Sequence, residues 1–205
     1  MQFESKKNII LASGSPRRQE LLTMAGIPFE TVTSGVDEDL DPALYDVYAY
    51  AEQLAAEKAN AVSEKHPDSL VIGADTIVVY DGEVLGKPQS KEEAKQYLEA
   101  LSGNVHEVIT AVAIADEGQL TTFHSVTKVT FYPIDEPLLE RYLALDEPYD
   151  KAGGYGIQSV GALFVKQIEG DYYTVMGLPI AELVWKLRMS GRIELVTEGG
   201  VFSDR

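Results

Sequence analysis

The stretch NIILASGSPRR, residues 8–18, passes from an apolar run into a helix start. Residues 8–12 predict a short buried strand. The Ser15-Pro16 pair is typical of a helix N-terminus, because serine caps the first turn and proline needs no hydrogen bond there. That end of a helix carries partial positive charge and favours acidic side chains, yet Arg17 and Arg18 follow. A bound anion, such as a phosphate, would explain the two arginines, and so would arginines that simply point into water.

Strands and helices alternate along the rest of the chain. The expected strands are residues 29–33, 70–79, 105–115 and 120–132, and the expected helices are residues 42–65, 90–101, 135–145 and 179–189. Asp81-Gly82 is a hairpin signal, and a second hairpin is expected to join residues 163–168 and 172–175. Hairpins combined with helical crossovers favour a mixed α/β sheet over an all-parallel one.

Composition limits the classes of function. The 205 residues include 17 Lys and Arg and 33 Asp and Glu, which gives a net charge of −16 and disfavours binding to nucleic acid or to anionic membranes. A phosphate substrate would therefore require the few cations to be concentrated locally. The absence of cysteine excludes disulfides and thiolate chemistry. No run of about 18 apolar residues, the length of a membrane span, is present, and no apolar segment of signal-peptide length follows the first seven residues, so a cytoplasmic location is expected.

Two charged residues interrupt apolar patterns. Lys58 falls within the apolar stripe of the helix expected over residues 42–65, where it is either a lysine at the rim of the core or a functional cation. Asp75 interrupts the apolar strand over residues 70–79. Burying a carboxylate without a partner costs several kcal/mol, so Asp75 is expected to face a metal ion, a cation or a water molecule, unless a strand end or bulge exposes it.

Three further segments carry candidate groups. Glu38 lies in an acidic loop that is either merely solvated or, together with Asp75, a source of oxygen ligands for Mg²⁺ or Mn²⁺. Lys87 precedes a proline, which holds it extended. Residues 151–158 combine a cation, glycines, an aromatic ring and an amide, which suit either closure over a nucleotide or an irregular loop. The chain lacks P-loop and dinucleotide-binding glycine motifs.

Five blocks taken together resemble the Maf (septum formation) family of nucleotide pyrophosphatases. They are Leu11–Arg18, Gly73–Thr76, Gly86–Pro88, Asp150–Gln158 and Gly177–Pro179. The resemblance runs from about residue 9 to residue 190, so residues 1–190 are expected to form a single Maf-like domain with two lobes. Residues 191–205 carry no clear period and are expected to be a loosely ordered tail.

The resemblance implies a fold and a reaction. The implied fold is an elongated mixed β-sheet flanked by helices, similar to that of inosine-triphosphate pyrophosphatases, with two lobes around a cleft. The implied reaction is hydrolysis of a nucleoside triphosphate to the monophosphate and pyrophosphate, with Mg²⁺ or Mn²⁺ as the cofactor. A homodimer is also expected by analogy with the family, and no nucleic-acid or membrane partner is expected.

The resemblance also implies roles for individual residues. Asp75 matches the proton acceptor of the family, and Glu38 and Asp75 would hold the metal. The other matched active-site positions are Ser13, Arg17, Arg18, Glu38, Lys58 and Lys87. Three positions mark the branch of the family that acts on dTTP and UTP. This chain has the matching residues there, which are Arg17, Thr76 and Gln158. We expect Arg17 and Arg18 to bind the triphosphate, Lys58 and Lys87 to balance charge on the leaving pyrophosphate, and Gln158 to read a pyrimidine edge.

Two other functions remain open at this point. One is a nucleotide-binding regulator of cell division and septum formation in which hydrolysis is vestigial. The other is a hydrolase that removes modified pyrimidine nucleotides. A sensor would need the cations that bind phosphate but would not need Asp75, so the complete set of charged groups favours an enzyme.

Overall fold

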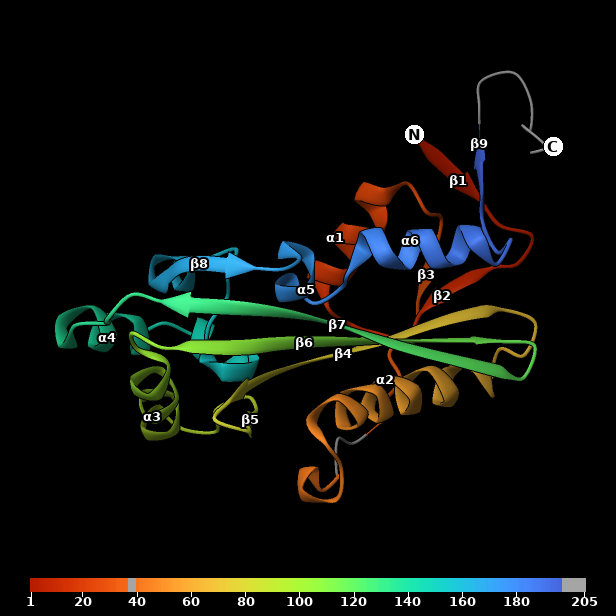
Figure 1. The fold of residues 1–205 in the computed structure, drawn as a ribbon. Helices are drawn as coiled ribbons and strands as arrows, with labels where there is room; N and C mark the ends of the chain where they lie inside the picture. The colour runs from red at the N-terminus through yellow and green to blue at the C-terminus, as the bar shows by residue number, and fades with distance from the viewer. Residues whose placement is uncertain (37–39, 197–205) are drawn as a thin grey trace.

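The computed structural model describes residues 1–36 and 40–196. Three long strands run along most of the molecule: β4 (Leu70–Tyr80), β6 (Val105–Asp116) and β7 (Gln119–Phe131) (Figure 1). Each is paired antiparallel with the next. In β4 and β6, β-branched and other apolar residues continue through most of the strand, as suits a strand covered on both faces, whereas β7 alternates β-branched residues with polar ones.

Shorter strands complete a mixed sheet. Its order is β3-β2-β4-β6-β7-β8, and β5 pairs with β4 outside this path. The bounds are β2 Ile9–Leu11, β3 Glu30–Thr31, β5 Glu83–Leu85 and β8 Val165–Glu169. Strand β2 runs parallel to β3 and β4, whereas the other pairs are antiparallel. The prediction of an elongated mixed α/β sheet is therefore confirmed.

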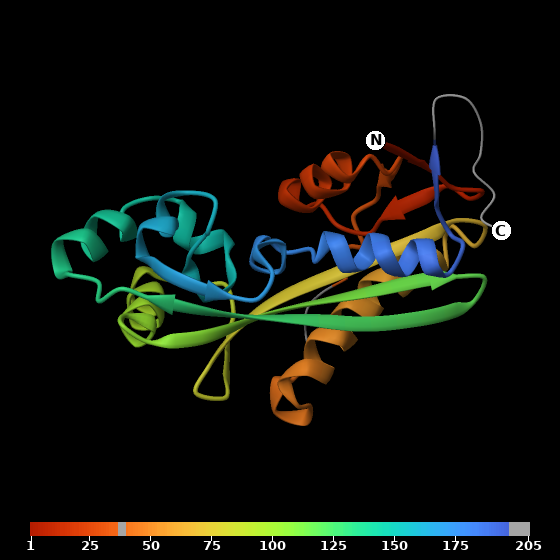
Figure 2. The same cartoon turned by 45° about the horizontal axis from the view of Figure 1, so that its top comes forward.

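Helices cover both faces of this sheet (Figures 1 and 2). Helix α2 (Val47–Ser63) packs on one face, and α1 (Pro16–Ala25), α5 (Tyr172–Met176) and α6 (Ile180–Met189) lie on the other. Helices α3 (Lys91–Leu101) and α4 (Glu136–Leu143) lie at the end of the sheet far from the termini. We call the half of the molecule that contains these two helices the distal half. Short 3₁₀ helices span Pro42–Leu44, Glu147–Asp150, Ala152–Gly154 and Val160–Phe164. None of the helices in the described ranges is long and apolar enough to cross a bilayer.

Helix α2 approaches β4 unusually closely at Gly73. A Cβ atom placed on Gly73 would lie 2.4 Å from the carbonyl oxygen of Ala55 and 2.7 Å from the nitrogen of Ala59. Backbone atoms of the helix thus occupy the space that any larger residue would need. The turn of α2 that makes this contact, between Ala55 and Ala59, also carries Lys58, and the contact therefore brings Lys58 close to Asp75 on β4.

Strand β4 has an open edge in its middle. On one side it pairs with β2 over residues 70–72 and with β5 over residues 78–80. Between these segments, residues 73–77 are paired only with β6 among the residues that the structure describes. Side chains from both faces of β4 can therefore reach the same space beyond this edge.

The structure corrects the second predicted hairpin. Residues 172–176 form helix α5 instead of a strand, and β8 pairs with β7. The side chain of Asp171 accepts hydrogen bonds from the backbone N–H groups of Tyr173 and Thr174, and Gly177 ends the helix with φ of 113°. An aspartate N-cap and a left-handed glycine together define a short helix and outweigh the strand propensity of the residues between them.

The ends of the chain and of helix α2 also differ from expectation. Asp46 caps α2, so the helix begins at Val47, five residues after the expected start. Strand β9 (Glu194–Val196) lies within the segment that was expected to be a loosely ordered tail. It pairs with β1 (Gln2–Glu4). The remainder of that segment, residues 197–205, lies outside the described residues.

A buried histidine lies in the core of the distal half. His106 is 2% exposed and packs edge-on against Phe131 and Tyr155. Its Nε2 lies 2.7 Å from the Tyr155 hydroxyl, whereas Nδ1 has no hydrogen-bond partner among the residues that the structure describes. Burial lowers the pKa of His106 from 6.5 to about 4, so the ring is neutral at pH 7.

This histidine makes stability depend on pH. Between pH 6.5 and about 4 the unfolded chain binds a proton at His106 and the folded chain does not, so acidification favours unfolding. From pH 6.5 to pH 5 we expect a loss of about 1.5 kcal/mol in the free energy of unfolding, because the slope rises to about 1.36 kcal/mol per pH unit only as the unfolded histidine becomes fully protonated. Urea unfolding at several pH values measures this loss. The His106→Phe variant is expected to lose this dependence of stability on pH. The control variant His66→Phe is expected to keep it. Equal slopes in the wild type and in His106→Phe would refute the assignment.

Candidate active site

A cleft of about 800 Å³ opens at the unpaired edge of β4, where the distal half meets the rest of the molecule. Its walls come from the start of α1, from α2, from the segment after β5 and from residues 150–159. The predicted site residues that line it are Ser13, Arg17, Arg18, Lys58, Asp75, Thr76, Lys87 and Gln158. Glu38, which was predicted to be a catalytic residue and metal ligand, lies outside the described residues. The structure therefore brings together eight residues from five separate stretches of the sequence.

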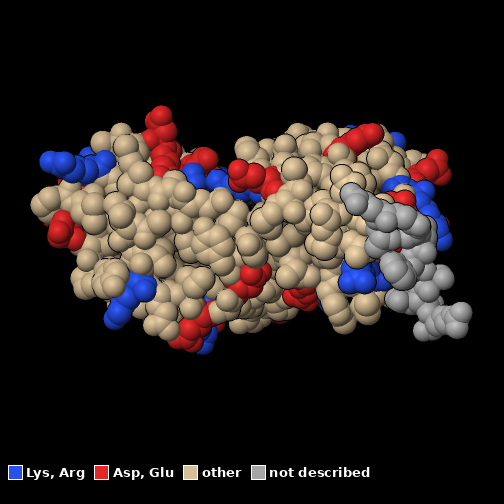
Figure 3. All heavy atoms as spheres, turned by 90° about the horizontal axis from the view of Figure 1, so that it is seen from above, with Lys and Arg blue, Asp and Glu red and all other residues tan. Residues whose placement is uncertain are grey.

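The charge of the cleft is opposite to that of the chain. Among the described residues, five cations line it against two carboxylates, an excess of three positive charges in a chain of net charge −16. The cations are Arg17, Arg18, Lys58, Lys87 and Lys151, and the carboxylates are Asp75 and Asp150. In the space-filling view, Lys and Arg atoms gather at the waist between the two halves, with Asp and Glu atoms beside them (Figure 3). Such a site attracts a multiply charged anion.

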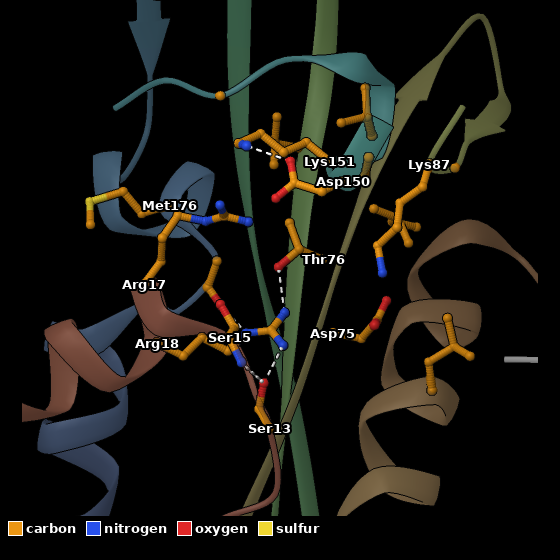
Figure 4. A pocket seen from close by; sticks show the side chains of 18 of the residues that line it. Ser13, Ser15, Arg17, Arg18, Asp75, Thr76, Lys87, Asp150, Lys151 and Met176 are labelled. Atoms are coloured by element: carbon orange, nitrogen blue, oxygen red, sulfur yellow. Dashed lines mark hydrogen bonds and ion pairs between the residues drawn. The ribbon is translucent and has the colours of Figure 1, made fainter. Parts of the chain in front are cut away.

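Arg17 and Lys87 point into the cleft from opposite sides (Figure 4). Arg17 lies in the first turn of α1, and Lys87 follows β5. Within the described residues, neither side chain makes a hydrogen bond or an ion pair. Two cations without protein partners on opposite walls are suited to binding one anion between them.

Arg18, in contrast, is held by the protein. Its Nε donates to the carbonyl of Gly177 at 2.8 Å, Nη1 donates to Ser13 Oγ at 3.0 Å, and Nη2 donates to Thr76 Oγ1 at 3.0 Å. These acceptors join α1, β4 and the end of α5. Arg18 therefore connects three elements around the cleft, and much of its hydrogen-bonding capacity is used within the protein.

The contact between Thr76 and Arg18 continues as a chain of hydroxyl groups. Thr110 Oγ1 donates to the carbonyl of Thr174 at 2.7 Å and lies 2.9 Å from Thr76 Oγ1. Because the Thr110 proton is used in that bond, Thr76 donates to Thr110 and accepts from Arg18. Each of these hydroxyl groups is thus fixed in one orientation. Thr110 was not predicted, because a threonine within the apolar strand β6 gives no signal of its own.

Asp75 lies on the opposite face of β4 and faces helix α2. The Lys58 Nζ is 2.5 Å from Asp75 Oδ1, and the two side chains are 11% and 9% exposed. The cation thus compensates the burial of the carboxylate, which resolves the anomaly in the apolar strand. The alternative of an exposed strand end is wrong, because Asp75 lies in the middle of β4 opposite Ala111.

Residues 150–159 form the distal wall of the cleft. Lys151 Nζ lies 2.5 Å from Asp150 Oδ1, and the backbone N–H of Gly153 donates to the carbonyl of Gly86 at 3.0 Å. Gln158 is exposed at the cleft surface. The segment is therefore tied to the residues that carry Lys87, and its amide side chain remains accessible.

The donor set of the cleft is sparse for a metal ion bound by protein alone. In the described ranges, no three His, Asp or Glu residues come together as metal ligands. Asp75 does supply a hard carboxylate oxygen beside a site suited to phosphate. Mg²⁺ in phosphate-transfer sites is held by one or two carboxylates together with substrate oxygens. The described residues therefore fit a cation that is held jointly with a phosphate ligand.

Comparison with known proteins agrees with this geometry. The profile of the Maf-like protein family matches residues 8–190. The chain belongs to the Maf family. Among its Maf relatives, a Bacillus cereus protein named dTTP/UTP pyrophosphatase is 51% identical over 185 residues, covering 90% of this chain and 91% of the relative. A Bacillus cytotoxicus protein of the same name is 52% identical over 182 residues, covering 89% and 95%.

Proposed function

We propose that this Maf protein hydrolyses dTTP and UTP, and by extension modified pyrimidine nucleotides, to the monophosphate and pyrophosphate. The observation that carries the proposal is the positively charged cleft in a strongly acidic chain, with a buried carboxylate at its floor. The names of relatives at 50–52% identity support the choice of substrate. Of the site residues, only Asp75 and Asp150 are acidic within the described cleft, which limits the candidates for the proton acceptor.

In the proposed mechanism, the triphosphate lies between Arg17 and Lys87. Arg17 and the N-terminus of α1 bind phosphate oxygens, because guanidinium and backbone N–H groups both donate to oxyanions. Lys87 approaches from the other wall and neutralises the charge that grows on the leaving pyrophosphate. The phosphate chain is thereby aligned beside Asp75.

Asp75 orients a water molecule and accepts its proton. The oxygen of this water forms a bond to the α-phosphorus while the bond between that phosphorus and the bridging oxygen of the β-phosphate breaks. Lys58 donates to Asp75 Oδ1 at 2.5 Å and thereby fixes the orientation of the carboxylate. A divalent cation such as Mg²⁺ or Mn²⁺, held by Asp75 with Glu38 and phosphate oxygens, would lower the pKa of bound water and neutralise phosphate charge.

Two residues are assigned to the base. Gln158 offers an amide donor and acceptor at the cleft surface, which suit the edge of a pyrimidine ring. Thr76 shapes the pocket and is held by Arg18 and Thr110. The proposal also includes a cytoplasmic location, where nucleoside triphosphates occur, and a homodimer, which light scattering would test.

A pyrophosphate-release assay tests the proposed function. Purified protein is incubated with dTTP, UTP, CTP, GTP, 5-methyl-UTP or pseudo-UTP in the presence of Mg²⁺ or Mn²⁺, and the nucleotide products are identified by chromatography. We expect rapid release from dTTP and UTP with formation of the monophosphate. Excess chelator is expected to remove activity, and added metal to restore it. Tight nucleotide binding without turnover on any substrate would contradict hydrolysis and favour the regulator of cell division.

Arg17 and Arg18 are expected to respond differently to truncation. Arg17→Ala should raise KM for UTP about tenfold or more with little change in the melting temperature, because Arg17 has no side-chain hydrogen bond or ion pair within the described residues. Arg18→Ala should lower the free energy of unfolding by about 1–3 kcal/mol, because it leaves hydrogen-bonding groups of Ser13, Thr76 and Gly177 unsatisfied. Steady-state kinetics and urea unfolding of both variants measure the difference. Unchanged kinetics in Arg17→Ala would remove this residue from the site.

A further inference from the structure

A single carboxylate closes the turn that follows Gln158. Glu147 lies at the start of the 3₁₀ helix Glu147–Asp150, and its side chain points back to the turn of residues 159–161. Oε1 accepts from Ser159 Oγ at 2.6 Å, from the backbone N–H of Gly161 at 3.0 Å and from Tyr142 Oη at 3.1 Å. Oε2 accepts from the backbone N–H of Val160 at 3.1 Å. Four donors thus converge on one side chain.

These donors need an ionised acceptor. The 3₁₀ helix Val160–Phe164 has no hydrogen bond from the side chain of its own N-cap residue, Ser159, and Glu147 satisfies its first N–H groups instead. Burial alone would raise the pKa of Glu147. The hydrogen bonds from Ser159 and Gly161 outweigh burial and lower this pKa, so the carboxylate is charged at neutral pH. Because an amide in its place would present an N–H₂ group, it could not accept all four bonds.

The turn itself is tightly packed. A Cβ atom on Gly161 would lie 2.8 Å from the nitrogen of Gly156 and 2.9 Å from the Tyr142 hydroxyl. A Cβ atom on Gly156 would lie 2.7 Å from Ser159 Oγ. The two ends of the segment 156–161 are therefore in direct contact, and Glu147 holds the contact closed from outside.

A second anchor fixes the other side of Gln158. Tyr155 is 5% exposed, its hydroxyl lies 2.7 Å from His106 Nε2, and its ring packs 4.7 Å from that of Phe131. Only residues 156–158 span the distance between this anchor and the turn held by Glu147. All three residues line the cleft. The position of Gln158 relative to a bound base is thus set by two fixed points within a few residues.

A fixed position of Gln158 matters if its amide distinguishes one base from another by hydrogen bonding. The edge of uracil presents an acceptor at O4 and a donor at N3, and cytosine presents the reverse. A glutamine amide can pair with either edge by turning over, since it has one donor end and one acceptor end. Holding the chain that carries it sets where the amide meets the base, and this is one requirement for preferring one edge over the other.

We propose that Glu147 is a positioning residue for nucleobase selection, because its carboxylate fixes the turn that follows Gln158 at the cleft. The inference rests on the proposed function. It assigns part of the selectivity for the base to Glu147, which is not among the described residues that line the cleft. The loss of Glu147 is expected to change which nucleotide is preferred more than how fast the bond is cleaved.

Steady-state kinetics on UTP and CTP test this role. Glu147→Gln is expected to lower the ratio of kcat/KM for UTP to that for CTP about tenfold, mainly through a higher KM for UTP. Ser159→Ala removes one of the four donors and is expected to lower the ratio by a smaller factor in the same direction. Glu140→Gln, a carboxylate on α4 that contacts Lys91 and Lys95, is the matched control and should leave the ratio unchanged.

A second measurement separates this inference from the proposed function. UTP and CTP are titrated calorimetrically into Asp75→Asn and into Asp75→Asn with Glu147→Gln, so that binding preference is read without turnover. A smaller preference for UTP in the double variant supports the positioning role even if the wild type hydrolyses neither nucleotide. Faster amide hydrogen exchange in residues 156–162 with an unchanged UTP to CTP ratio in kinetics and binding would show a structural role only and overturn the inference.

Discussion

Asp75→Asn is expected to lower kcat for UTP about 10³-fold. The carboxylate is the proposed acceptor for the proton of the attacking water, and an amide of the same shape accepts no proton at neutral pH. A 10³-fold loss corresponds to about 4 kcal/mol of transition-state stabilisation. KM is expected to change much less, because Arg17 and Lys87 bind the triphosphate in the proposal. A loss smaller than tenfold would remove Asp75 from the centre of the mechanism.

The experiment needs a control for folding and one for charge. The amide oxygen of the replacement still accepts a hydrogen bond from Lys58, so the protein is expected to remain folded, as thermal melting will show. Asp150→Asn removes the second carboxylate of the described cleft, which is paired with Lys151. It should leave kcat within a few-fold of the wild type. Equal losses in both variants would indicate a general effect of cleft charge in place of proton transfer.

Gly73→Ala is expected to lower the free energy of unfolding by about 3 kcal/mol. The added methyl group would lie 2.4 Å from the carbonyl oxygen of Ala55 and 2.7 Å from the nitrogen of Ala59, and neither backbone atom can move without moving α2. A shift of α2 away from the sheet would also draw Lys58 away from Asp75. We therefore expect kcat to fall together with stability.

Gly86→Ala provides the matched control for this substitution. Nothing lies within 4 Å of a Cβ atom at Gly86, and its φ is outside the left-handed region. Urea unfolding of both variants is expected to show a large loss for Gly73→Ala and a change within about 0.5 kcal/mol for Gly86→Ala. Similar stabilities for the two variants would mean that α2 adjusts without cost and that the close contact at Gly73 does not position Lys58.

Part of this arrangement could be predicted from local sequence patterns. The apolar run of residues 70–79 indicated strand β4, and the apolar stripe of residues 42–65 indicated helix α2. Asp75 and Lys58 were each conspicuous because a charge interrupted one of these patterns. A sequence pattern does not show that two such anomalies meet, and the 2.5 Å contact between them depends on how closely α2 packs at Gly73.

Other features depend on partners that are distant in sequence. The resemblance assigned Arg18 to phosphate binding, and the structure shows its guanidinium bound to Ser13, Thr76 and Gly177, the last of them 159 positions away. Glu147 gave no signal at all, because a glutamate before a proline is an ordinary helix start. The hairpin expected over residues 163–175 was wrong for a local reason, because the Asp171 cap stabilises a short helix where the residues themselves favour a strand.

The open edge of β4 places two different kinds of chemistry on neighbouring residues. Asp75 points to the face covered by α2, and Thr76 points to the face covered by α1 and α5. The ladder with β6, from Val71 opposite Ala115 to Val79 opposite Glu107, fixes which residue takes which side. In the proposed mechanism, cleavage and recognition therefore depend on two residues with adjacent codons. A one-residue slip of β4 against β6 would exchange the two faces, so it would move Asp75 away from Lys58 and Thr76 away from Arg18 at the same time.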